Sequence, residues 1–224
     1  MADATAQRWW RVFLIVAAVH LGAQAAGIGL LQTVTKPLLM PVLALWAATS
    51  MPASRLRTLL LVALGWSWLG DVLLMPGGGT WFLLGLGAFL LAQLTYAGAF
   101  WPFRQHSLLT TPVRVLPYLV LLVGLPAVLW GDLGDLRVPV TVYATVIVSM
   151  AVLATGLNRA TGIGAGLFVL SDALIAAGTV TGALRLPVHD LWVMLTYLAA
   201  QGLLAQGIRA GALRGPQRRD LRVR

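Results

Sequence analysis

The chain has 224 residues, of which 59% are hydrophobic and only 10% are charged. Soluble domains carry about 25% charged residues, so this composition, with a mean hydropathy of +0.85, excludes an ordinary soluble domain and predicts an integral membrane protein. The net charge of +9 would suggest a nucleic-acid partner in a soluble protein, but no soluble module remains to bind one. The absence of cysteine excludes disulfides, thiolate metal sites and a cysteine nucleophile.

Eight apolar stretches follow one another along the chain, separated by clusters of Arg, Pro or Gly. A tilted transmembrane helix needs about 17 to 25 residues, so the pattern predicts an all-α bundle of eight transmembrane helices. One domain would cover residues 1–208, followed by a basic cytoplasmic tail over 209–224. The predicted spans are 10–31, 34–51, 57–75, 81–102, 112–130, 138–157, 163–181 and 190–208. Pro37 is placed near the start of the second span, where a proline is tolerated.

The first span also resembles a cleavable signal peptide, because Arg8 and Arg11 precede a short apolar run that ends in small residues. The apolar run continues to Leu31, past the would-be cleavage point, and this favours a retained helix.

Charge asymmetry tests the count of eight spans independently of hydropathy. With both termini on one side, that side holds thirteen of the sixteen basic residues, namely Arg8, Arg11, Arg55, Arg57, Arg104, Arg114, Arg159, Arg209, Arg214, Arg218, Arg219, Arg222 and Arg224. The other side holds only Lys36, Arg137 and Arg185. Because Lys and Arg are retained on the cytoplasmic face, both termini are predicted to be cytoplasmic. The strong preference for Arg over Lys suggests a GC-rich bacterial genome and hence the bacterial inner membrane.

Two acidic residues lie inside apolar spans, Asp71 in the third and Asp172 in the seventh. An isolated carboxylate in hydrocarbon costs a few kcal/mol or more, so such residues usually face a bundle interior or a wet cavity. From the helical rise, each lies about 20 Å from the cytoplasmic boundary. We therefore predict that the two carboxyl groups lie at similar depth and that they share a cavity if the third and seventh helices are neighbours in the bundle.

The spacing of 101 residues that separates Asp71 from Asp172 also superposes Tyr96 on Tyr197 and the first four spans on the last four. This indicates a possible 4+4 parallel internal repeat. Leu- and Gly-rich chains match themselves often, so chance similarity is the alternative.

Two carboxyl groups in one dry cavity are not expected to ionise together, which leaves an acid beside a carboxylate. This arrangement serves reactions with an oxocarbenium-like transition state. Alternatives are a purely structural role, in which each Asp bonds Ser67, Tyr197 or another helix, and proton translocation by a transporter.

Other polar residues are candidates for substrate binding. Tyr197 and Gln201 are one helical turn apart and share a face. Lys36, the only lysine, lies on the outer side and could hold a phosphate, or could simply snorkel at a helix end. Tyr143 is either a cavity residue or an interfacial anchor. Arg137 and Arg185 are weaker candidates for the phosphate site. The three His residues are too dispersed to indicate a metal site, and no cofactor motif is present.

An ordered set of short motifs resembles the lysoplasmalogenase-like (YhhN) family of membrane proteins. The set comprises Lys36-Pro37, Gly70-Asp71, Gly85 to Phe89, Tyr96 to Phe100, Tyr143 to Met150, Gly164 to Asp172 with Phe168 and Ser171, and Tyr197 to Gln201. The resemblance implies an eight-helix fold and cleavage of the vinyl ether bond of a lysophospholipid, which releases a fatty aldehyde and a glycerophospho-alcohol.

The resemblance also implies roles for individual residues. Under the resemblance Asp71 and Asp172 would be catalytic. With it in view, we expect no metal to take part and Lys36, Tyr96, Tyr143, Ser171, Tyr197 and Gln201 to bind substrate. One departure is Gln93, which stands where the family is expected to have His. A proton-coupled transporter is the main alternative. An intramembrane aspartyl protease is disfavoured because Trp68 replaces the first glycine of its Gly-x-Gly-Asp motif.

Overall fold

The computed structural model describes residues 2–182 and 186–214, and within these ranges the chain is helical and contains no strand. The eight α-helices are α1 (Ala2–Ala25), α2 (Gly29–Ser50), α3 (Arg55–Leu73), α4 (Gly79–Phe100), α5 (Pro112–Leu129), α6 (Arg137–Ala154), α7 (Arg159–Leu174) and α8 (His189–Arg214). Short 3₁₀ helices, η1 (Trp101–His106), η2 (Leu108–Thr110) and η3 (Gly134–Leu136), flank α5, and a π-helix, η4 (Ile175–Val180), extends α7. The predicted all-α class is confirmed.

Six helical segments of the described chain are long and apolar enough to span a membrane. They are Gly29–Ser50, Arg55–Leu73, Gly79–His106, Gly134–Ala154, Arg159–Gly178 and His189–Arg214. The protein is therefore an integral membrane protein, as its composition predicts.

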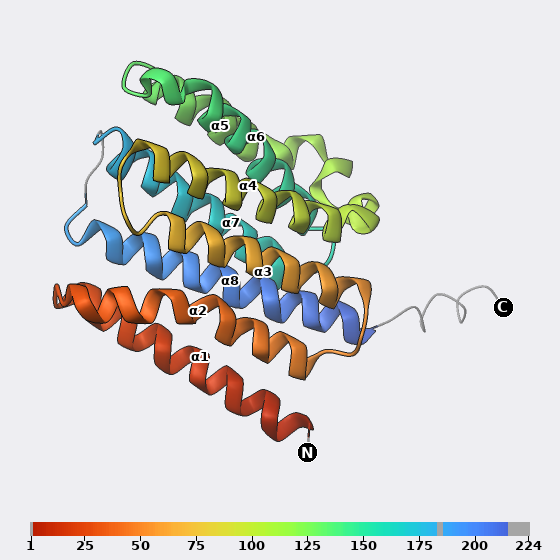
Figure 1. Cartoon of the computed structure of the whole chain (residues 1–224). Helices are drawn as coiled ribbons and strands as arrows, with labels where there is room; N and C mark the ends of the chain where they lie inside the picture. The colour runs from red at the N-terminus through yellow and green to blue at the C-terminus, as the bar shows by residue number, and fades with distance from the viewer. Residues whose placement is uncertain (1, 183–185, 215–224) are drawn as a thin grey trace.

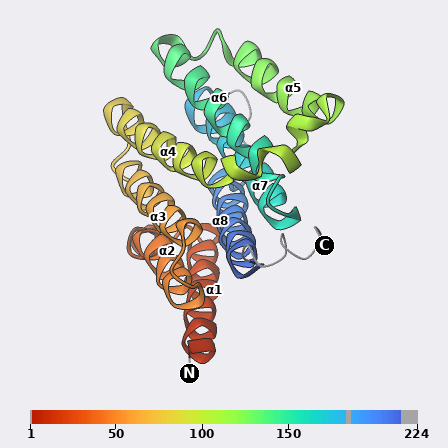
Figure 2. The same cartoon turned by 90° about the vertical axis from the view of Figure 1, so that its right-hand side faces the viewer.

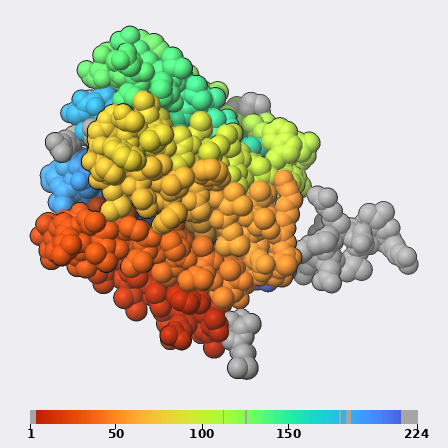
Figure 3. Space-filling view, viewed as in Figure 1, coloured from red at the N-terminus to blue at the C-terminus, as the bar shows by residue number. Residues whose placement is uncertain are grey.

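Helix α8 lies at the centre of the bundle. It packs along α7 and also contacts α1, α2 and α3, while α1 pairs with α2 and α3 pairs with α4. Helix α5 packs mainly on α6 and stands at the far edge of the molecule (Figures 1 and 2). On the face seen in Figure 3, α2, α3 and α4 cover most of the surface and α8 shows only at one edge. Polar residues on α8 are thus shielded by neighbouring helices.

The position of the two prolines in α2 differs from the prediction. Helix α2 begins at Gly29, so Pro37 lies well inside it and not in its first turn. A proline at position 41 cannot donate to the carbonyl four residues earlier, which belongs to Pro37. The indole Nε1 of Trp68 on α3 donates to that carbonyl at 3.0 Å. The hydrogen bond that Pro41 cannot make is replaced by a contact between α2 and α3.

Helix α8 also runs further than predicted, to Arg214. Arg209, placed in the tail by the sequence, donates from Nε to the Ser50 carbonyl at the end of α2. The rest of the predicted tail, residues 215–224, lies outside the described residues, as does Arg185. Residues 2 and 214 lie at the same end of the bundle (Figure 1).

Candidate active site

Asp71 lies in the part of the bundle where α3, α4 and α8 meet. Its side chain is 3% exposed, and the Tyr197 hydroxyl on α8 donates to its Oδ2 at 2.8 Å. The preceding residue must be small, because a Cβ on Gly70 would lie 2.6 Å from the Phe89 ring on α4. Gly70 thus lets α4 approach α3 closely beside the carboxyl group.

Gln201 holds Tyr197 in place. Its Oε1 accepts from the Tyr96 hydroxyl at 2.7 Å, and its Nε2 donates to Ser67 Oγ at 3.0 Å and to the Tyr197 hydroxyl at 3.4 Å. Tyr197 accepts from Gln201 and therefore turns its own hydrogen toward Asp71. The predicted residues Tyr96, Tyr197 and Gln201 thus form one buried network that ends at a carboxyl group.

Asp172 lies at the end of α7 and has a different partner. The Tyr143 hydroxyl on α6 donates to its Oδ2 at 2.5 Å. Tyr143 is buried and lines both cavities at Asp172, so it is not an interfacial anchor. Asp172 itself is half-buried, because it lines two small, mostly apolar cavities. The helix widens to the π-helix η4 just beyond it, a feature often found at functional sites.

The surroundings of the two carboxyl groups differ. A cluster of three aromatic rings, Phe89, Phe168 and Tyr197, packs between α4, α7 and α8 with centroids 5.4 to 6.3 Å apart. Asp71 is enclosed by protein, whereas Asp172 faces cavities. Only Asp172 is therefore placed to touch a bound molecule.

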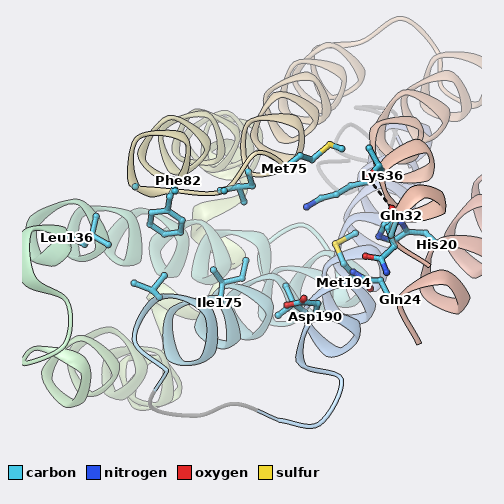
Figure 4. A pocket seen from close by; sticks show the side chains of 18 residues that line it. His20, Gln24, Gln32, Lys36, Met75, Phe82, Leu136, Ile175, Asp190 and Met194 are labelled. Carbon is cyan, nitrogen blue, oxygen red and sulfur yellow. Dashed lines mark hydrogen bonds between the residues drawn. The ribbon is translucent and has the colours of Figure 1, made fainter. Parts of the chain in front are cut away.

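A larger cavity of about 700 Å³ opens at the end of the bundle opposite the described chain ends (Figure 4). Lys36 projects into it from α2. Its lining shares Leu74, Phe82, Ile175 and Val180 with one of the cavities at Asp172. The polar space at Lys36 and the apolar space at Asp172 thus adjoin each other, and the two spaces together are referred to as the path.

Other candidate residues lie away from this path. The Ser171 hydroxyl donates to the Val193 carbonyl at 3.0 Å, so it fastens α7 to α8. Arg137 donates to the Trp130 carbonyl and stacks on the Trp130 ring. Gln93 is fully buried, and neither Nε2 nor Oε1 of its amide has a hydrogen-bond partner in the described part of the chain.

The Lys36 cavity is also lined by His20, Gln24 and Asp190, which are not among the site residues predicted from the sequence. His20 and Gln24 are four residues apart and so lie on one helix face. This spacing is the feature of the sequence from which the pair could have been predicted. No cluster of three or more His, Cys, Asp or Glu that could hold a metal is found among the described residues.

Comparisons with known proteins identify the family. The model of the YhhN family matches residues 31–208. A protein of Mycobacterium bovis named lysoplasmalogenase is 36% identical over 89% of this chain and 79% of its own length. The proteins named lysoplasmalogenase TMEM86B from Rattus norvegicus and Homo sapiens are each 35% identical, over 81% and 79% of this chain and 72% and 74% of their own lengths. No solved structure matches the chain. On these matches, the chain belongs to the YhhN family.

Proposed function

We propose that this protein is a membrane-embedded hydrolase that cleaves the vinyl ether bond of a lysophospholipid to a fatty aldehyde and a glycerophospho-alcohol. The observation that carries the proposal is Asp172, which is held by Tyr143 and faces two apolar cavities, one of which adjoins the Lys36 cavity. Its relatives named lysoplasmalogenase support the same reaction.

The substrate would lie along this path with its ends in different environments. Lys36 holds the phosphate as a point charge. The hydrocarbon chain occupies the apolar cavity between α5, α6 and α7, which is lined by residues such as Leu121, Ile147 and Val169. Because Asp172 borders this cavity as well as the one toward Lys36, the vinyl ether lies against its carboxyl group.

The chemistry follows from this placement. The protonated Asp172 gives its proton to the β-carbon of the vinyl ether, and an oxocarbenium ion forms. Water adds to this cation while the Asp172 carboxylate accepts a proton from the water. The resulting hemiacetal collapses: its hydroxyl loses a proton, the glyceryl oxygen gains one, and the C–O bond breaks to release aldehyde and alcohol. Asp71 is too enclosed to touch substrate, so its role is to stabilise the cation through space.

The tyrosines and Gln201 are assigned as positioning residues under this proposal. Tyr143 orients Asp172, and Tyr197, with Gln201 and Tyr96 behind it, orients Asp71. Ser171 keeps α7 in register with α8. The sequence predicts that these three tyrosines, Gln201 and Ser171 touch the substrate. Under this proposal they instead contact the carboxyl groups, one another or the backbone.

We also propose that residues 1–208 form one domain with eight transmembrane spans in a bacterial inner membrane. Both termini, and the basic segment 209–224, would be cytoplasmic, and the Lys36 cavity would open on the outer side. The repeat at a spacing of 101 residues is part of this proposal. It is supported by Tyr96 and Tyr197, which the repeat superposes and which serve one network.

Mass spectrometry of lysoplasmalogens incubated with purified protein tests the function. The wild-type protein should release fatty aldehyde, and Asp172→Asn and Asp71→Asn should each lower the rate by about 100-fold or more, since each removes a charge or proton donor from the reaction. Asp132→Asn, an exposed change outside the cavities, is the control. Full activity in both variants would disprove the mechanism. Solute uptake by proteoliposomes without any aldehyde would indicate a carrier instead.

A further inference from the structure

The Lys36 cavity contains two opposite charges that do not neutralise each other. Lys36 reaches in from α2 and Asp190 from the start of α8 (Figure 4). No ion pair joins them in the part of the chain that the structure describes, and no hydrogen bond occupies either charged group there. A ligand that carries both a negative and a positive group would complement this cavity.

Hydrogen-bond acceptors surround the same space. The Thr35 hydroxyl donates its single hydrogen to the Leu31 carbonyl at 2.6 Å, so it can only accept from His20 Nδ1, 2.8 Å away. His20 therefore carries its hydrogen on Nδ1 and has a lone pair on Nε2. That Nε2 is buried and has no partner among the described residues, and the same holds for Gln24 Oε1. His20, Gln24 and Asp190 all line the cavity, and the first two each carry a buried acceptor that no described residue satisfies.

We propose that Asp190, His20 and Gln24 form a subsite for a primary ammonium group, so that the enzyme prefers an ethanolamine headgroup to choline. The inference rests on the proposed function and adds the headgroup to it. An –NH₃⁺ group donates three hydrogen bonds and can satisfy all three acceptors. A trimethylammonium group has no N–H to donate. It is normally recognised by several aromatic faces, and Phe82 is the only Phe, Tyr or Trp among the described residues that line this cavity.

Two residues of the subsite lie outside the part of the chain that the family model matches. His20 and Gln24 belong to α1 and lie outside residues 31–208, which the family model matches. The preference is therefore inferred from this chain and not from the family as a whole. Lys36, on α2, would hold the phosphate between the ammonium subsite and the path to Asp172.

A series of headgroups tests the proposal. Aldehyde release is measured with lysoplasmalogens that carry ethanolamine, N-methylethanolamine, N,N-dimethylethanolamine and choline, a series that loses one N–H donor at each step. The expected kcat/KM falls along the series, to about one tenth or less for choline, because each lost hydrogen bond to a charged group weakens binding. In Asp190→Asn, kcat/KM for ethanolamine should fall by about tenfold and the ratio of ethanolamine to choline should approach one. Asp132→Asn, exposed and outside the cavity, should keep the wild-type ratio.

Binding measurements separate this inference from the proposed function. Glycerophosphoethanolamine should bind the wild-type protein more tightly than glycerophosphocholine in isothermal titration calorimetry, and Asp190→Asn should remove the difference. If aldehyde appears at equal rates with all four headgroups, or if Asp190→Asn leaves the ratio unchanged, the ammonium subsite is wrong while the function stands. If no substrate yields aldehyde but the binding preference remains, the function is wrong and the subsite stands.

Discussion

Each carboxyl group of the site has its own tyrosine, and the two pairs differ in exposure. Tyr197 and Asp71 are both buried, whereas Tyr143 bonds a carboxyl group that faces cavities. A tyrosine hydroxyl that donates to a carboxyl group fixes the orientation of that carboxyl group. Changing the tyrosine to phenylalanine removes the hydrogen bond and leaves the ring, so packing changes little. The Tyr143–Asp172 pair is therefore the more direct test of how the reacting group is positioned.

We expect Tyr143→Phe to lower kcat for aldehyde release by about 10- to 100-fold, the range expected for one hydrogen bond to a charged group. KM should change little, because Tyr143 does not reach the headgroup. Tyr118→Phe, at a half-buried tyrosine of α5, is the matched control and should keep full activity. A Tyr143→Phe enzyme as fast as wild type would show that Asp172 needs no partner.

At the scale of the helices, close packing between α7 and α8 depends on single glycines. A Cβ on Gly164 would lie 2.9 Å from the Leu204 nitrogen and 3.0 Å from the Ala200 carbonyl, both backbone atoms that cannot move without shifting α8. The same helix carries Gly166, where a Cβ would meet nothing within 4 Å. These two positions form a natural pair for mutation.

Gly164→Ala should separate α7 from α8 and cost about 1 to 3 kcal/mol, as overpacking usually does. Thermal unfolding in detergent should show a lowered midpoint, and activity should fall because Asp172 and Tyr197 lie on the two separated helices. Gly166→Ala should leave both unchanged or slightly raise the midpoint, since alanine favours a helix. An equal effect of both changes would contradict the packing argument.

The contact between α2 and α3 gives a second prediction at this scale. Trp68→Phe removes the donor to the Pro37 carbonyl and should lower stability by about 1 kcal/mol, the usual net value of a hydrogen bond. Trp81→Phe is the control, because Trp81 has a similar exposure, 44% against 40% for Trp68. Unfolding midpoints of the two variants would compare them directly, and a smaller loss for Trp68→Phe would count against the proposed role.

The sequence predicts the positions of the helices better than it predicts the side-chain contacts between them. Hydropathy locates each helix to within a few residues, apart from the earlier start and end of α1 and the longer α8, because apolar runs are a local property. Which tyrosine bonds each carboxyl group depends on contacts between helices that are far apart in the sequence. Counting residues along α8 predicts the depth of Tyr197, but Asp71 and Asp172 are predicted at similar depths. Depth therefore does not decide which carboxyl group Tyr197 bonds. Pro37 lies well inside α2 because the helix begins at Gly29, before the predicted start of the span at residue 34.

At the scale of the whole molecule, most of the described arginines and the Lys36 cavity lie at opposite ends of the bundle. Nine described arginines belong to the end that holds residues 2 and 214, namely Arg8, Arg11, Arg55, Arg57, Arg104, Arg114, Arg159, Arg209 and Arg214. The Lys36 cavity opens at the other end. Since arginine is retained on the cytoplasmic side, a substrate would enter from the outer half of the membrane.

Single cysteines can test this orientation, because the chain has no cysteine of its own. Thr110, the last residue of η2, and Asp132, in the turn after α5, are both exposed and lie at opposite ends of α5. In right-side-out membrane vesicles, a membrane-impermeant maleimide should label Asp132→Cys at once and Thr110→Cys only after the vesicles are lysed. Labelling of Thr110→Cys alone would invert the topology and turn the Lys36 cavity toward the cytoplasm. Labelling of both before lysis would mean that α5 does not cross the membrane, which would remove one of the eight proposed spans.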